Sequence, residues 1–93
     1  MTHNTTYETA CEALLLVICV YSKRAMNAHR VGDTKGTARS LQLIRECIEE
    51  QRSLVDLSIP QLMEIMEKYA ARYRELTGLS PWKESEGPSS EER

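Results

Sequence analysis

Apolar residues occupy both sides of the first helix that the sequence predicts, over residues 6–30. Within it, residues 13–21 form a run without a polar break. At 100° per residue, one side carries the stripe Tyr7, Ala10, Leu14, Val17, Ile18, Tyr21, Ala25 and Ala28. The other side carries Leu15, Leu16, Cys19, Val20 and Met26. A helix that is apolar all round needs cover all round, which a single neighbouring helix cannot provide.

The second predicted helix, over residues 38–55, has two apolar stripes. The first consists of Leu41, Ile44, Ile48 and Val55, and the second of Leu43, Cys47 and Leu54. The third predicted helix, over residues 59–77, has a single stripe, made of Leu62, Ile65, Met66, Tyr69, Tyr73 and Leu76. One covered face therefore satisfies the third helix, whereas the second helix is predicted to contact two partners.

Local signals set the predicted helix ends. Thr5 and Glu8 fit a capping box before the first helix, and Thr34 or Thr37 can cap the second after a glycine-containing loop. The third helix has the clearest boundaries, because Ser58 and Gln61 form a capping box and Gly78 is the expected left-handed terminator.

These patterns predict an all-α three-helix bundle in residues 1–82, followed by a disordered acidic tail in residues 83–93 that contains no apolar residue. A three-helix bundle leaves either Leu15, Leu16, Cys19 and Val20 or the second stripe of the second helix to be covered by something else. Leaving about four such side chains in water forgoes roughly 6–10 kcal/mol of burial, comparable with the stability of a small domain. We therefore expect a symmetric homodimer; the alternative is a monomer whose first helix is sandwiched between the other two.

Composition narrows the functional classes. A formal net charge of −2 argues against nucleic acid or an anionic membrane as the main target. The apolar run is about half as long as a membrane span, and acidic Glu8 and Glu12 precede it where a signal peptide would be basic. Three cysteines without a C-x-x-C pair are typical of a reducing compartment, so the predicted location is the cytoplasm.

Candidate chemistry is sparse, and no catalytic residue, cofactor or metal is predicted. Arg24 and His29 have the R-x4-H spacing of helical nucleases, in which the histidine is the general base and the arginine binds phosphate. The simpler interpretation is that both are basic residues near a helix C-terminus, where they complement the helix dipole.

The residues predicted to bind a partner combine acidic and apolar side chains on the second helix. They are Glu46, Glu49, Glu50, Asp56, Leu43, Cys47 and Leu54. Carboxylates without an accompanying histidine do not predict a metal, whereas an acidic patch bordering an apolar stripe suits a protein partner. Trp82 is interpreted either as a cover for the end of the bundle or as an interface anchor.

The layout resembles a known family. The motifs are the apolar opening A-L-L-L-V-I-C-V-Y-S-K-R (residues 13–24) and the ending Y-R-E-L-T-G-L-S-P-W (residues 73–82). In this order, around a polar loop, they resemble the small all-helical immunity proteins that bacteria pair with type VI secretion toxins, some of which are dimeric. The resemblance implies a non-enzymatic inhibitor that occludes a toxin, and it carries over no site residue. The alternative is a cytoplasmic antiactivator that sequesters a transcription factor through a hydrophobic helix face.

Overall fold

The computed structural model describes residues 2–79, and every secondary-structure element in this range is helical. Helix α1 spans His3–Arg30, α2 spans Thr34–Ser53, a 3₁₀ turn η1 spans Leu54–Asp56, and α3 spans Ile59–Thr77. The prediction of an all-α fold with three main helices is confirmed. Trp82 and the predicted tail of residues 83–93 lie outside the described residues.

Helix α1 begins three residues earlier than the sequence predicted. Its N-cap is Thr2, whose hydroxyl accepts a hydrogen bond of 3.1 Å from the backbone N–H of Thr5. Thr5 was expected to be the cap itself, together with Glu8. Because Thr2 offers the same hydroxyl acceptor before Thr5, the helix gains extra residues and Thr5 falls inside it.

Helix α2 also begins earlier, at Thr34 rather than at residue 38, and its cap is neither Thr34 nor Thr37. The carboxylate of Asp33 accepts a hydrogen bond of 2.9 Å from the N–H of Gly36. Aspartate is a stronger N-cap than threonine. Gly36 also leaves room for this contact, since a Cβ at that position would meet the Asp33 carboxylate. The cap therefore outweighs the cost of a glycine in the first turn, which is about 1 kcal/mol relative to alanine.

Helix α3 has the predicted boundaries. The hydroxyl of Ser58 accepts from the N–H of Gln61 at 3.4 Å, and the amide oxygen of Gln61 accepts from the N–H of Ser58 at 2.9 Å. The helix ends at Gly78, whose φ of 77° lies in the left-handed region. Both ends are thus set by residues next to the helix in the sequence.

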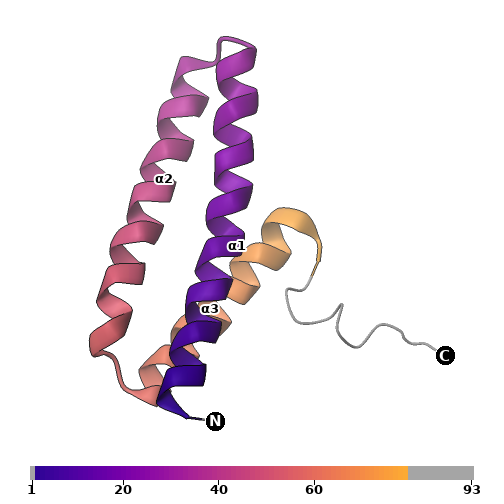
Figure 1. Cartoon of the computed structure of the whole chain (residues 1–93). Coiled ribbons are helices and arrows are strands. Elements are labelled where there is room, and N and C mark those ends of the chain that lie inside the picture. Colours follow the sequence, from indigo (N-terminus) through magenta and orange to yellow (C-terminus); the bar gives the residue numbers. More distant parts are fainter. Residues whose placement is uncertain (1, 80–93) are drawn as a thin grey trace, which may run out of the picture.

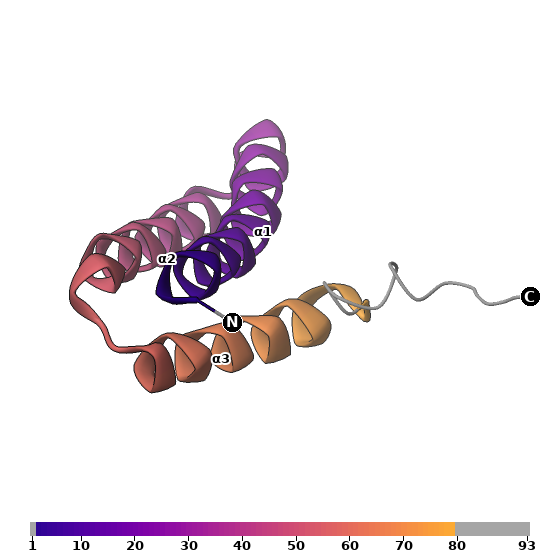
Figure 2. The ribbon, with the colours of Figure 1, turned by 60° about the horizontal axis from the view of Figure 1, so that its bottom comes forward.

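The helices form two layers. Helices α1 and α2 run antiparallel beside one another, and α3 crosses α1 on one side of this pair (Figure 1, Figure 2). Helix α1 packs against both other helices and is the centre of the fold. The packing within the chain is thus that of the alternative prediction, in which α1 lies between α2 and α3. The predicted homodimer remains a prediction.

The core lies where α1 meets the other two helices. Its buried residues are Ala10, Ala13, Leu14, Val17, Tyr21, Cys47, Leu54, Leu62 and Tyr69. The side chain of His3 bonds to the carbonyl oxygen of Leu57 at 2.9 Å and so links the start of α1 to the segment before α3. All the buried residues of α1 lie on the side that packs on α2 and α3, so its remaining sides depend on solvent or a partner.

Candidate functional site

The apolar residues that the sequence assigned to partner binding are largely part of the core. The side chains of Cys47 and Leu54 are 2% and 0% exposed, and Leu43 is half-buried against the core cluster. Neither Cys47 nor Leu54 can reach a partner while the fold is intact. The choice of this stripe as the binding surface is therefore corrected: it is the stripe through which α2 packs on its own chain.

The exposed apolar surface of α2 is the other stripe. Leu41 is 47% exposed and Ile48 is 37% exposed, with half-buried Ile44 between them. Their spacing places them in one row along the helix. This row lies about 100° around α2 from the buried row that contains Cys47.

The exposed row of α2 faces away from α3. Glu50, which contacts α3, lies on the opposite side of the buried row from Ile44 and Ile48. On α1, Tyr21 contacts Arg72 of α3 at 3.3 Å, whereas Leu15 and Ile18 lie farther round the helix on the side away from that contact. Both exposed rows therefore belong to the side of the α1–α2 pair that α3 leaves uncovered.

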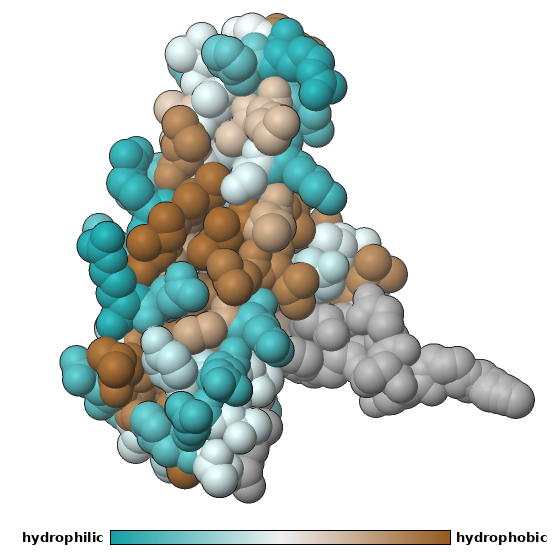
Figure 3. Space-filling model, viewed as in Figure 1, coloured by the Kyte–Doolittle hydropathy of each residue, from teal (hydrophilic) through white to brown (hydrophobic). Residues whose placement is uncertain are grey.

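We call this surface the open face and define it as Leu15, Ile18, Leu41, Ile44 and Ile48. Figure 3 shows it as a hydrophobic area over α1 and α2, on the side turned away from α3. Ile18 and Ile44 are partly buried against the core, and Leu15 is 49% exposed, so the open face is an outward continuation of the core.

The four residues of α1 that were predicted to need cover fall into two pairs. Leu15 and Cys19 are exposed and lie one turn apart on the side of the open face. Leu16 and Val20 are half-buried and also lie one turn apart, about 100° farther around the helix. Only the first pair lies on the side of the open face: Leu15 is part of it, and Cys19 lies next to it.

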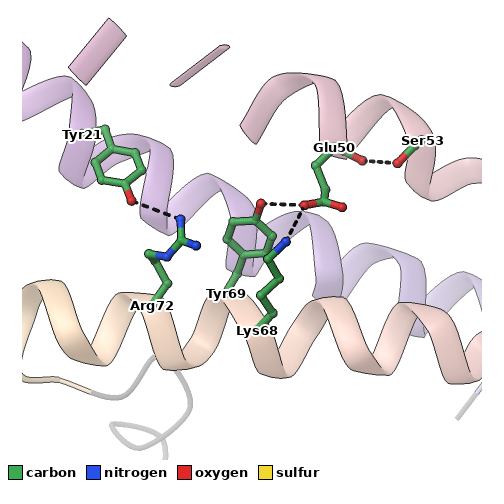
Figure 4. Close-up of polar contacts among 6 residues, drawn as sticks. All are labelled: Tyr21, Glu50, Ser53, Lys68, Tyr69 and Arg72. Carbon is green, nitrogen blue, oxygen red and sulfur yellow. Dashed lines mark hydrogen bonds and ion pairs between the residues drawn. The ribbon is translucent and has the colours of Figure 1, made fainter. Parts of the chain in front are cut away.

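The predicted acidic patch is divided by the fold. Glu50 accepts hydrogen bonds from Lys68 at 3.0 Å and from the hydroxyl of Tyr69 at 2.7 Å, and therefore joins α2 to α3 (Figure 4). Glu46 and Glu49 are exposed, about 160° and 100° around α2 from Ile48, and Asp56 is exposed in η1. We call Glu46 and Glu49 the acidic flank; it faces away from the open face.

The electrostatics around Glu50 are those of a structural contact. The hydrogen bond from Tyr69 is the main reason why the pKa of Glu50 is lowered. Burial, followed by the carboxylate of Glu50, raises the pKa of Tyr69. Lys68 and Arg72 lie over the Tyr69 ring, at 5.2 and 5.6 Å from its centroid. No local pattern predicts this link, because its members come from two helices.

The remaining candidate residues do not converge within one chain. Arg24 and His29 are both exposed on the continuous helix α1 and point about 140° apart around its axis. Within residues 2–79, no group of three or more His, Cys, Asp or Glu side chains is arranged so that it could hold a metal ion. Burial raises the pKa of Cys47, which keeps this thiol protonated and inert. A hollow of about 440 Å³ next to the α1–α2 turn, lined by residues that include His29, Asp33 and Leu41, was not anticipated.

Comparisons with protein-family models, curated proteins and solved structures found no match to this chain. The resemblance to immunity proteins therefore remains a prediction based on layout. None of the helices in residues 2–79 is both long enough and apolar enough to cross a membrane.

Proposed function

We propose that this protein is a non-enzymatic inhibitor that binds another protein through surfaces of α1 and α2. The open face is the observation that supports the proposal. It places exposed Leu15, Leu41 and Ile48 on one side of a pair of packed helices. A contiguous apolar area of this kind on a small domain is typical of a protein-contact surface.

The first candidate is an immunity protein that occludes a toxin domain in the cytoplasm. The acidic flank supports it, because Glu46 and Glu49 are exposed and suited to steering a basic partner into contact. Glu50 is excluded from this role, since its carboxylate is engaged by Lys68 and Tyr69. A toxin that is held by exposed charges should dissociate as the salt concentration rises.

The second candidate is an antiactivator that sequesters a transcription factor. The open face favours it, because two parallel rows of aliphatic side chains suit the apolar side of an amphipathic helix. The surface differs from the one predicted from the sequence: Leu41 and Ile48 take the place of buried Cys47 and Leu54. Binding of this kind depends on apolar burial and should tolerate salt.

A comparative pull-down tests both candidates. The full chain, a Glu46→Lys/Glu49→Lys variant and an Ile48→Lys variant are immobilised, and proteins captured from the source cell are identified by mass spectrometry. If the partner is a toxin, the wild type should capture a basic protein. The Glu46→Lys/Glu49→Lys variant should not capture it, and about 0.5 M salt should release it. If the protein is an antiactivator, the wild type should capture a transcription factor, and only the Ile48→Lys variant should fail to capture it. If no captured protein responded to either change, the proposed function would be wrong.

A further inference from the structure

We infer that the open face is covered by a second copy of this chain, in a two-fold dimer that sets α1 of each protomer against α2 of the other. This inference rests on the proposal that the open face is a protein-contact surface. It agrees with the first candidate function, in which the acidic flank meets the partner, and it conflicts with the second, in which the open face itself binds the transcription factor. A two-fold interface must be complementary to itself, so each charged group at the border of the open face needs an opposite charge at the position that the two-fold axis sets against it. The two edges of the open face meet that requirement.

The edge on α1 is acidic in its N-terminal half. Going around α1 from the core through Ile18 and Leu15, the next exposed charged side chains are Glu8 and Glu12. Lys23 lies on the same edge, about three turns from Glu12 and about four turns from Glu8, and is closer to the α1–α2 turn. The acidic segment is therefore the half of this edge that lies far from the turn.

The edge on α2 is basic in the corresponding half. Going around α2 from the core through Ile44 and Ile48, the next exposed charged side chains are Arg52 and Arg45. Both lie in the C-terminal half of α2, which is the half far from the turn. One protomer therefore presents an acidic edge and a basic edge on either side of the same apolar area.

One residue of each charged segment lies at the same height along the helices. Helices α1 and α2 are antiparallel and joined by a turn between Arg30 and Thr34 (Figure 1). Glu12 precedes Arg30 by 18 residues (30 − 12), and Arg52 follows Thr34 by 18 residues (52 − 34). At 1.5 Å per residue, both lie about 27 Å from the turn. A two-fold axis parallel to the helices keeps heights unchanged, so it sets Glu12 opposite the partner's Arg52, twice per dimer.

The other face-to-face arrangement pairs like helices, with the axis perpendicular to them. It sets the basic edge of one α2 against the basic edge of the other, and Glu12 near the partner's Lys23. Pairing α1 with the partner's α2 instead joins an acidic edge to a basic edge in the half of the helices far from the turn, with Glu12 and Arg52 at the same height. In this arrangement Glu46 and Glu49 point outward on both protomers, because they lie away from the open face.

A charge-swap experiment on the full chain tests the inference by sedimentation equilibrium up to about 100 μM, a range that detects weak dimers. The wild type should dimerise. Glu12→Arg and Arg52→Glu should each weaken the dimer about tenfold, since each change replaces two attractive edge contacts by repulsive ones. The double variant should regain the wild-type dissociation constant to within about threefold. Ile48→Lys should abolish the dimer.

The matched control is Glu46→Arg, an exposed charge reversal about 160° around α2 from Ile48, which should leave the dimer unchanged. Circular dichroism should show unaltered helicity in every variant. A monomeric wild type, a double variant that is not rescued, or rescue of Glu12→Arg by Lys23→Glu would each overturn the inference. A monomer that still captured a partner would refute only the dimer, whereas a dimer without a partner would refute only the proposed inhibitor.

Discussion

The hydroxyl of Tyr69 on α3 donates a hydrogen bond of 2.7 Å to the carboxylate of Glu50 on α2. This contact joins two helices that otherwise meet mainly through α1. The ring of Tyr69 is 3% exposed, so its hydroxyl has little access to water and depends on Glu50 as its acceptor. The sequence analysis placed Glu50 in an acidic surface cluster. In the structure its carboxylate links α2 to α3.

Replacing Tyr69 by phenylalanine should lower the free energy of unfolding by about 1–2 kcal/mol, because Glu50 loses a donor to its charged carboxylate. Chemical denaturation measures the change. Tyr73→Phe is the matched control, since its hydroxyl has no hydrogen bond among the described residues, and it should stay within about 0.5 kcal/mol. If Tyr69→Phe and Tyr73→Phe changed the free energy of unfolding equally, the hydrogen bond from Tyr69 to Glu50 would not contribute to stability.

The Glu50 contact should also make stability depend on pH in the acid range. The pKa of Glu50 is lower in the folded chain than its ordinary value of 4.5, mainly because of the Tyr69 hydrogen bond. The ionised carboxylate therefore stabilises the fold above about pH 4.5, and this contribution is lost as pH falls through the folded pKa.

Glu50→Gln should accordingly be less stable than the wild type at pH 7, and the difference should shrink as the pH falls from about 5 to 3. Thermal unfolding at several pH values provides the measurement. A difference that stayed constant over this range would contradict the assignment of a lowered pKa to Glu50.

Two adjacent residues of the second-helix region test which stripe is in the core. Leu54 is 0% exposed and Val55 is 61% exposed. Leu54→Ala should destabilise the fold by about 2–5 kcal/mol through loss of burial and a residual cavity. Val55→Ala should change stability by no more than about 0.5 kcal/mol. If Val55→Ala destabilised the fold more than Leu54→Ala, the prediction from the sequence, in which Leu54 belongs to an exposed partner-binding surface, would be restored.

The cap of α2 provides another test. Asp33→Ala should cost about 1 kcal/mol and reduce helicity at the start of α2, because the N–H of Gly36 loses its acceptor. Thr34→Ala should be nearly neutral, since Thr34 is exposed and does not cap the helix. Urea denaturation compares the two variants. A larger loss from Thr34→Ala would favour the cap that the sequence first suggested.

The sequence predicted the end of α1 and both ends of α3 because the signals that set them are local, whereas α2 ends at Ser53, two residues before the predicted end, and a 3₁₀ turn follows. Ser58 and Gln61 satisfy each other across a single turn, and Gly78 terminates α3 through its own backbone conformation. The errors were also local: Thr2 and Asp33 are caps that compete with Thr5, Thr34 and Thr37. A competing cap one turn away changes where a helix begins without changing which helix forms.

The sequence by itself therefore determined that the chain forms three helices, and that α1 and α2 carry more apolar surface than one chain's packing requires. It could not determine which stripe of α2 turns inward, because both stripes have similar apolar content. That choice depends on where α1 and α3 lie relative to α2, and the tertiary structure decided it. Cys47 and Leu54 are placed in the core and Leu41 and Ile48 on the surface. Burial depends on neighbours that are distant in the sequence, whereas a cap depends on residues within one turn.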